Sequence, residues 1–514
     1  MNTPSFPKIP SFSKIPSFPR RWEPGQATGY ALQARVRKKD WSVTAIARTC
    51  AATLLLVLLQ PAASSSAAQA GVTIPAFERV LMPNGAVLVL MERHDVPLIS
   101  FTAVMRGGAL TDPAKQSGMA SLLAGLLEKG AGKRDAAAFA DALAAVGGVI
   151  ATDSEAERIS VDGSFLARDQ ALMIEVLADI LQRPRLDRAQ FTALQSRYIE
   201  FIRSAKDSDL ESLAPIYGKA ALFRDHPYGK PARGSEATLA AITHEDLQGY
   251  YREQFGSDRL ILSVAGDFST AKMKQMLNAA FKGWHKAAAS LPGVTTPAGV
   301  DARRVVLIDA PDSVQSYFWA GNLGVARSFP SRAALDVVNT LFGGRFTSML
   351  NSELRIRTGL TYGARSRFER LTQPGAWQMS SYTRTEKTIE AIDLAFTVLD
   401  GLHKTGIDPA MLASGKTYVQ GQFPLALETS DQWAGTLADL EFYGLGRNYI
   451  DGYGAALAAV SADDARRIIE ERFPTSDHLT LVVIGKASAI RDGLRKYGPI
   501  TEMKLSDPAF TVDR

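Results

Sequence analysis

The sequence predicts an α+β fold made of two homologous halves, each with a mainly antiparallel sheet and packed helices. The main observation is an internal repeat, because residues 242–266 and 460–485 share one order of capped helix, polar turn and apolar strand. The two copies begin 218 residues apart, which is about half of the chain that follows residue 70. Within each half, short strands precede long helical stretches, and this segregation argues against a doubly wound parallel sheet.

Both copies of the repeat carry the same helix start. Thr243 and Ser461 are each followed three residues later by an aspartate, which predicts a capping box at the two helix N-termini. Each helix is expected to end at an aromatic residue, Phe255 or Phe473. The apolar strand that follows ends in a glycine in both copies, so the whole unit of helix, turn and strand is repeated.

Apolar runs predict two early strands in each half. These strands are residues 86–91 and 99–105 in the first half, and residues 305–308 and 316–320 in the second.

A stretch rich in Pro, Gly, Ser and Thr predicts the joint between the halves. We expect a linker over residues 287–301, because this composition does not support a packed helix or strand. The N-terminal half then covers residues 71–286, and the C-terminal half covers residues 302–514.

Residues 1–70 are expected to be a disordered leader plus a secretory signal peptide. A basic stretch at 35–39 precedes an apolar run at 51–59, and the small-residue sequence Ala-Gln-Ala ends at Ala70. This order is typical of an export signal, so we predict cleavage after Ala70 and a periplasmic location. An apolar run of nine residues is too short to span a bilayer, so no stable membrane span is expected.

The leader also accounts for the basic charge of the chain. The formal charge is +5, but residues 1–70 hold nine basic and two acidic groups, and the remaining 444 residues carry a net charge of −2. A nucleic-acid partner is therefore not expected. The single cysteine, Cys50, also lies in the leader, so the exported chain would have neither a disulfide nor a thiol nucleophile.

Common catalytic motifs are absent from the sequence. The closest two of its six histidines are 18 residues apart, so no pair of histidines can share one helix face and bind zinc. The chain also has no G-x-S-x-G elbow, no phosphate-binding P-loop and no G-x-G-x-x-G fingerprint.

The run HPYGKPARGSEATLAAITHEDLQGYYREQFGSDRLILSVAGDFS at residues 226–269, together with the duplication, resembles the pitrilysin/insulinase family of zinc peptidases. The resemblance implies two homologous α+β halves, with an H-x-x-E-H zinc motif on a helix of the first half. Gly118 to Ala120 and Lys129-Gly130 match the residues that frame this motif.

The three zinc-motif positions in that frame are Ser121, Ala124 and Gly125. Both histidine ligands and the glutamate base are missing, and these residues cannot hold zinc or activate water. The resemblance places a third ligand, a glutamate, about 75 residues further on, where this chain has Glu200. Glu200 is either a relic of that ligand or a solvated carboxylate on an amphipathic helix. His226 is expected to be a structural residue of its turn.

The second half resembles the family at residues 343–362, GGRFTSMLNSELRIRTGLTY, which match a glycine-containing loop, a helix and an Arg/Tyr pair. The resemblance implies that Arg355 and Tyr362 reach across a chamber to the zinc site and hold the substrate. Two donors of this kind can stabilise the oxyanion that forms when water attacks a peptide bond. The alternative is that Arg355 only satisfies helix carbonyls and Tyr362 only packs.

The local pattern around the pair predicts a helix that is followed by a strand. Phe346, Leu350 and Leu354 recur every four residues and give the helix one apolar stripe. Gly359 is placed to end the helix in a left-handed conformation, and Tyr362 is expected to open the next strand.

Gly343 and Gly344 have two interpretations. They form either a substrate-contacting loop, as the resemblance implies, or only a tight turn between helices.

Loss of the zinc motif with retention of the Arg/Tyr pair resembles the non-catalytic subunit of a heterodimeric zinc metallopeptidase. The resemblance implies that this chain is no enzyme alone, has no cofactor of its own, and positions peptide substrates for a homologous partner that supplies zinc. One alternative is a structural or peptide-binding protein of the same fold. An autonomous hydrolase with another site is a second alternative, but no motif supports it.

Overall fold

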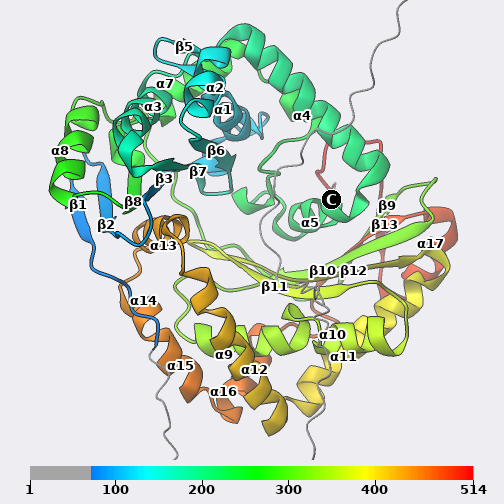
Figure 1. Cartoon of the computed structure of the whole chain (residues 1–514). Coiled ribbons are helices and arrows are strands. Elements are labelled where there is room, and N and C mark those ends of the chain that lie inside the picture. Colours follow the sequence, from blue (N-terminus) through cyan, green and yellow to red (C-terminus); the bar gives the residue numbers. More distant parts are fainter. Residues whose placement is uncertain (1–70, 513–514) are drawn as a thin grey trace, which may run out of the picture. The chain divides into compact units, whose positions relative to one another are not determined.

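The computed structural model describes residues 71–512, and its main features are two six-stranded sheets (Figure 1). The predicted leader, the signal peptide, its cleavage after Ala70 and Cys50 lie outside the described residues. None of the described helices is both long and apolar enough to cross a bilayer.

The two sheets are formed by different halves of the chain. In spatial order, the first sheet consists of β1 (Glu78–Leu81), β2 (Val87–Glu92), β8 (Leu260–Gly266), β3 (Leu98–Arg106), β7 (Arg158–Leu166) and β6 (Val149–Ser154). The second sheet consists of β11 (Ala364–Arg370), β12 (Pro374–Arg384), β10 (Gln315–Leu323), β13 (Thr480–Gly485), β9 (Arg304–Asp309) and β14 (Ile500–Lys504). A small ladder joins β4 (Gly130–Ala131) to β5 (Arg134–Asp135).

Five strands of each sheet follow one topology. The order β2-β8-β3-β7-β6 in the first sheet matches β9-β13-β10-β12-β11 in the second. In both sheets the first pair is parallel and the other three pairs are antiparallel. Only the outermost strand differs, because β1 pairs antiparallel to β2 whereas β14 pairs parallel to β9. The predicted α+β fold with two homologous halves is confirmed.

The helices also fall into two groups. The first half contains α1 (Met119–Leu127), α2 (Ala136–Ala144), α3 (Gln170–Gln182), α4 (Arg188–Ser208), α5 (Leu210–Phe223), α6 (Glu236–Ala240), α7 (His244–Gln254) and α8 (Thr270–Phe281). The second half contains α9 (Arg332–Asn339), α10 (Met349–Asn351), α11 (Thr388–Thr405), α12 (Pro409–Gln422), α13 (Ser430–Phe442), α14 (Asn448–Asp451), α15 (Tyr453–Ala459), α16 (Ala462–Arg472) and α17 (Ala487–Leu494).

The repeated helix has the predicted caps in both halves. Thr243 caps α7 and Ser461 caps α16, and both caps are complete capping boxes in which the aspartate three residues later returns a hydrogen bond. Phe255 and Phe473 end the two helices, and both side chains are buried. The repeat read from the sequence is therefore a repeat of local structure.

Each half lends one helix to the sheet of the other half. Helix α5 of the first half packs on β10 and β13, and helix α13 of the second half packs on β3 and β8 (Figure 1). One shared core joins α5 to the second sheet, and another joins α13 to the first sheet. Because burial of apolar area stabilises by roughly 25 cal/mol per Å², this exchange links the folding of the two halves.

The contact between α5 and the second sheet is close because Gly218 faces Trp319. The indole of Trp319 is fully buried, and a β-carbon at position 218 would lie 2.6 Å from its Cε3 and 2.7 Å from its Cε2. Such distances are shorter than van der Waals contact, so the helix reaches the sheet only because this residue has no side chain.

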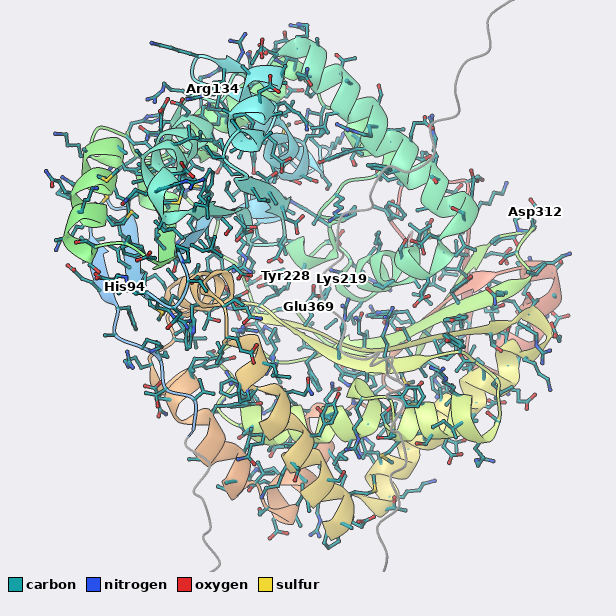
Figure 2. The ribbon with its side chains drawn as sticks, in the orientation of Figure 1. His94, Arg134, Lys219, Tyr228, Asp312 and Glu369 are labelled. Carbon is teal, nitrogen blue, oxygen red and sulfur yellow. The ribbon has the colours of Figure 1, made fainter. Side chains whose placement is uncertain are left out.

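Polar contacts also join the halves, and Tyr228 and Glu157 are buried. Tyr228 donates a hydrogen bond to Glu157 (2.7 Å), and the carboxylate of Glu157 accepts one from the main-chain N–H of Thr372 in the second half (3.0 Å). Lys219 of α5 forms an ion pair with Glu369 of β11 (3.1 Å), and these two residues are neighbours in Figure 2. A buried polar group that loses its partner costs ~1–3 kcal/mol, so the contacts of Glu157 help to fix how the halves pack.

Candidate functional site

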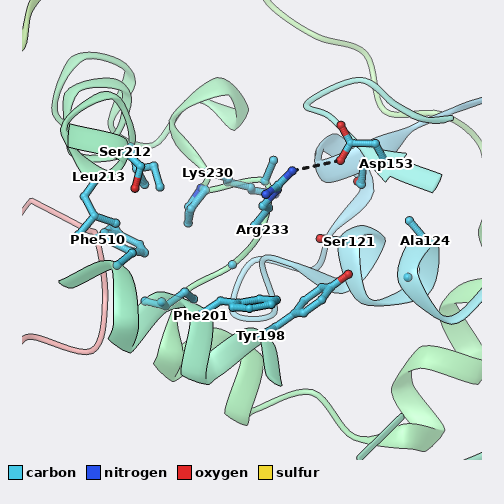
Figure 3. A pocket seen from close by; sticks show the side chains of 18 of the residues that line it. Ser121, Ala124, Asp153, Tyr198, Phe201, Ser212, Leu213, Lys230, Arg233 and Phe510 are labelled. Carbon is cyan, nitrogen blue, oxygen red and sulfur yellow. Dashed lines mark hydrogen bonds and ion pairs between the residues drawn. The ribbon is translucent and has the colours of Figure 1, made fainter. Parts of the chain in front are cut away.

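The three zinc-motif positions lie on α1 at the wall of a cavity of about 590 Å³ (Figure 3). Ser121, Ala124 and Gly125 all line this cavity, together with residues of α4, α5 and the loop at 229–234. The sequence frame therefore brings the three positions to one face of one helix, as the resemblance implies.

Asp112 fixes the start of α1. Its carboxylate accepts hydrogen bonds from the main-chain N–H groups of Gly118 (2.7 Å) and Ala120 (2.9 Å). An acceptor at this position satisfies N–H groups that the helix leaves free. The carboxyl is buried, and burial raises the pKa of Asp112 to about 7.

Tyr198 of α4 takes up the space beside Gly125. A β-carbon at position 125 would lie 2.5 Å from the Tyr198 hydroxyl and 2.9 Å from Cδ2 of Leu194. Burial raises the pKa of Tyr198, so the phenol stays protonated at neutral pH. A side chain as large as histidine does not fit at position 125 unless Tyr198 moves.

The donors of the cavity do not match a zinc site. Zinc sites in proteins use His, Cys, Asp or Glu side chains, most often four ligands in total. The wall offers the Ser121 hydroxyl, the Tyr198 phenol and the Asp153 carboxylate, and Asp153 is paired with Arg233 at 3.5 Å. Among residues 71–512, no three His, Cys, Asp or Glu side chains are placed to share a metal ion.

Glu200 lies outside this cavity. Its side chain on α4 is 65% exposed and pairs with Arg203 one turn further on, at 2.6 Å. The cavity is lined instead by the next residue of the helix, Phe201. The structure therefore places Glu200 as a solvated carboxylate and not beside Ser121, Ala124 and Gly125.

Arg355 and Tyr362 contact each other in the structure. The guanidinium of Arg355 lies 4.2 Å from the ring centroid of Tyr362 and 4.7 Å from that of Phe346. Both distances are within the range of cation–π contacts. The ring of Tyr362 is 70% exposed, so the pair presents a cation and a phenol at the surface of the described chain.

Phe346 plays a different part from the one that its spacing predicts. Leu350 and Leu354 are buried, whereas Phe346 is 58% exposed and stacks on Arg355. The helix begins after Ser348, whose hydroxyl caps α10, so Phe346 precedes the helix and cannot belong to its apolar stripe. The four-residue spacing was therefore wrong in placing Phe346 on the buried side of the helix, and the structure places its ring on Arg355.

The segment between the two paired residues is irregular. After α10, residues Ser352–Arg357 form a π-helical turn, and Gly359 has a φ of +64°, as expected for a left-handed helix end. The next strand, β11, begins at Ala364, so Tyr362 precedes the strand and does not open it. Its ring is therefore not held in a ladder of cross-strand neighbours.

Gly343 and Gly344 form the end of a second π-helical turn, Thr340–Gly344. Gly343 is buried, and a β-carbon there would lie 2.5 Å from the main-chain nitrogen of Ser366, so close packing on β11 explains this glycine. Gly344 is exposed. His226 caps the turn 227–229 and contacts the carbonyl of Thr295 at 2.9 Å, as expected for a structural residue.

The start of α5 connects the cavity to the Arg/Tyr region. Ser212 lines the cavity, and the adjacent Glu211 accepts a hydrogen bond from Arg365 of β11 (2.9 Å). Burial raises the pKa of Tyr382 of β12, and the charges of Glu211 and Arg355 also act on this phenol. The first turn of α5 thus reaches both the cavity and β11, the strand that follows Tyr362.

Relatives share both sequence and fold with this chain. An uncharacterized zinc protease of Mycobacterium leprae is 25% identical over 71% of this chain and 82% of its own length. The non-peptidase homolog YmxG of Helicobacter pylori is 22% identical over 70% of this chain and 83% of its own length. The crystal structure of a peptidase M16 inactive domain from Pseudomonas fluorescens has a TM-score of 0.75 with this chain, covering 80% of it and 98% of the other, at 20% identity.

Two family descriptions match consecutive parts of the chain. Residues 89–236 match the insulinase family, peptidase family M16, and residues 241–418 match the peptidase M16 inactive domain. Together the matches include strands of both sheets, the three zinc-motif positions and the Arg/Tyr pair. The chain belongs to the insulinase family, peptidase family M16.

Proposed function

We propose that this chain is the non-catalytic subunit of a heterodimeric zinc metallopeptidase, which binds and positions peptide substrates for a zinc-bearing homologous partner. The observation that carries the proposal is the contrast between two sites on one chain. Zinc ligands are missing at Ser121, Ala124 and Gly125, whereas Arg355 and Tyr362 are in contact and accessible. An exposed cation and phenol in contact are available to a substrate, as the proposed role requires.

Zinc and the general base come from the partner in this proposal, and the chain itself carries no cofactor. The donor set around Tyr198 supports this assignment, because a protonated phenol, a hydroxyl and one paired carboxylate do not form a zinc site. The name of the Helicobacter pylori relative, a non-peptidase homolog, also agrees with a non-catalytic role.

Arg355 supplies a fixed positive charge to the substrate. The rings of Phe346 and Tyr362 both contact its guanidinium, and the N–H groups of this planar group point outward along its edge. A peptide carbonyl that approaches this edge meets donors that are already oriented. Preorganised donors of this kind stabilise developing negative charge by a few kcal/mol.

Tyr362 supplies a second donor. Its phenol is exposed and can donate a hydrogen bond to the oxyanion that forms when zinc-activated water attacks the peptide bond. The ring contact with Arg355 holds both donors at one place on the surface, which favours binding of one carbonyl oxygen by both groups.

The metal content and activity of the isolated chain test the proposal. The purified chain is expected to contain no stoichiometric zinc and to cleave no peptide, and addition of the zinc-bearing partner is expected to give chelator-sensitive cleavage. Chelator-sensitive cleavage by the isolated chain would overturn the proposal. Stable association with a homologue that remains inactive would favour the structural or peptide-binding alternative.

The predicted signal peptide places both subunits outside the cytoplasm in this proposal. Sequencing of the protein recovered from a cell envelope fraction is expected to give an N-terminus at Gly71. A product that still carries residues 1–70 would contradict this location.

A further inference from the structure

The cavity beside the erased zinc positions has the walls of a binding site. We propose that it binds the carboxyl-terminal end of a peptide, with an apolar last side chain against one wall and the free carboxylate at the basic side. This site needs no partner and no zinc, because every residue that forms it belongs to this chain. It therefore goes beyond the proposed subunit role.

One wall of the cavity is apolar and open to a ligand. Phe201 lines the cavity, yet its side chain is 62% exposed, which leaves a large apolar surface in water. Ile202 follows it on α4, and Leu213 and Ile216 of α5 continue the wall. Contact with an apolar side chain would remove this surface from water at roughly 25 cal/mol per Å².

Phe510 closes the apolar end. Its ring packs on Tyr217 at 5.0 Å between centroids and is itself buried, so this part of the wall is fixed. Helix α6 holds the same segment through a hydrogen bond from Ala237 to the carbonyl of Pro508 (3.0 Å). A fixed wall binds an apolar side chain without a large cost of ordering.

The opposite side of the cavity is basic. Lys230 and Arg233 line it. Lys219 also lines the cavity, from the same helix as Leu213 and Ile216, and Asp153 is the only carboxylate among the described lining residues. In the view of Figure 3, Lys230 and Arg233 lie across from Tyr198 and Phe201. A ligand with one negative charge and one apolar group matches both sides of the cavity at once.

Two of the three cations have donors to spare. Lys230 donates to the main-chain carbonyl of Asp112 (3.0 Å), an acceptor without charge, and an ammonium group has three donors. Arg233 is paired with Asp153 at a long 3.5 Å, and its side chain is 77% exposed. Both groups can therefore donate to a carboxylate that enters the cavity. Such hydrogen bonds would be strong, because charge-assisted hydrogen bonds are about twice as strong as neutral ones.

The volume sets the size of the ligand. At about 590 Å³ the cavity lies within the ~300–1,000 Å³ that is usual for small-ligand sites, which is enough for the last one or two residues of a peptide. The main chain of an internal peptide segment would bring no negative charge to Lys230 and Arg233. The free carboxylate is therefore the group that distinguishes the proposed ligand.

Binding of a labelled tetrapeptide to the isolated chain tests the proposal. The probe is Ala-Ala-Ala-Leu with a fluorophore on its N-terminus, used once with a free carboxylate and once as the amide, with anisotropy as the readout. The acid is expected to bind at least tenfold more tightly than the amide, because only the acid carries the charge. Equal binding of acid and amide, or no binding of the acid at millimolar concentration, would overturn the proposal.

Two pairs of variants place the binding in this cavity. Phe201→Glu is expected to weaken binding of the acid at least tenfold by placing a negative charge on the apolar wall, while Phe201→Leu keeps binding within about threefold of the unmodified chain. Arg233→Gln is expected to weaken binding of the acid, while Arg384→Gln, at an equally exposed arginine paired with Glu386, leaves it unchanged. All of these side chains are exposed, so the variants are expected to fold.

Wild-type affinity of Phe201→Glu would exclude this cavity. Because no partner is present, failure of this test leaves the proposed subunit role intact.

Discussion

Gly218→Ala is expected to destabilise the protein, although alanine favours a helix. The new β-carbon would lie 2.6 Å from Cε3 and 2.7 Å from Cε2 of Trp319, and this indole is fully buried between α5 and the second sheet. Overpacking of this kind costs ~1–3 kcal/mol, and the gain in helix propensity returns up to ~1 kcal/mol. Because the close neighbour is a rigid and fully buried ring, the cost is expected at the upper end of this range, which leaves a net loss of ~2 kcal/mol in the free energy of unfolding.

Gly249→Ala is the matched control for this substitution. Gly249 also lies inside a helix, α7, but its nearest neighbour would be Nη2 of Arg252 at 3.9 Å, an ordinary contact. Helix propensity then dominates, and a gain of roughly 0.5–1 kcal/mol is expected.

The two variants can be compared in one assay. Urea unfolding followed by tryptophan fluorescence is expected to show a lower midpoint for Gly218→Ala and a higher midpoint for Gly249→Ala than for the unmodified protein. The opposite signs exclude a general effect of alanine. An equal or higher midpoint for Gly218→Ala would refute the close contact between α5 and the second sheet.

Three further predictions concern the polar groups of the site. Asp112→Asn should remove a pH dependence of the free energy of unfolding. The pKa of Asp112 is raised in the folded chain, so this residue contributes its full stabilisation below pH ~4 and loses it as the pH rises to about 7. Urea unfolding of the unmodified protein and of the variant across this pH range measures the difference. Tyr228→Phe should cost ~1–3 kcal/mol in the free energy of unfolding, because a buried carboxylate loses its donor; unchanged stability would show that this contact does not join the halves. Restoring His, Glu and His at the three zinc-motif positions should still give no stoichiometric zinc in metal analysis, because Tyr198 occupies the space beside position 125; full zinc loading would contradict this reading of the cavity.

The local structure could be predicted well because it depends on local interactions. Thr243 and Ser461 mark their helix starts through hydrogen bonds to residues three positions away, so the capping boxes are visible in the sequence. Gly359 likewise ends its helix in a left-handed conformation that favours glycine.

The arrangement around the site depends on contacts between distant residues, which periodicity does not report. Spacing alone places Phe346 on the apolar stripe of Leu354, but the cap at Ser348 starts the helix later and leaves Phe346 free to stack on Arg355. Ser348 could have shown where the helix starts, because residues that precede a hydroxyl N-cap lie outside the helix.

The exchange of α5 and α13 between the halves could not be predicted from the repeat. A repeat shows that two segments share one local structure, but it does not show which sheet each helix covers. The sequence shows only that Gly218 is a glycine within a helix. The contact with Trp319 of the other half explains why this residue has no side chain. The position of Glu200 could not be predicted from its distance along the chain either. One step along a helix turns a side chain by about 100°, so Phe201 lines the cavity whereas Glu200 points to solvent.

The most direct test of the subunit role is the turnover of the complex that carries Tyr362→Phe in this chain. The substitution removes one hydroxyl and keeps the ring that contacts Arg355, so the dimer and the pair should persist while one donor to the oxyanion is lost. We predict that kcat for chelator-sensitive peptide cleavage falls ten- to a thousandfold, on the order expected for loss of one such donor. Tyr449→Phe is the control, because the ring of Tyr449 contacts a different arginine, Arg332, and its loss of a hydroxyl is expected to leave kcat unchanged. Unchanged kcat in an intact complex that carries Tyr362→Phe would contradict the subunit role.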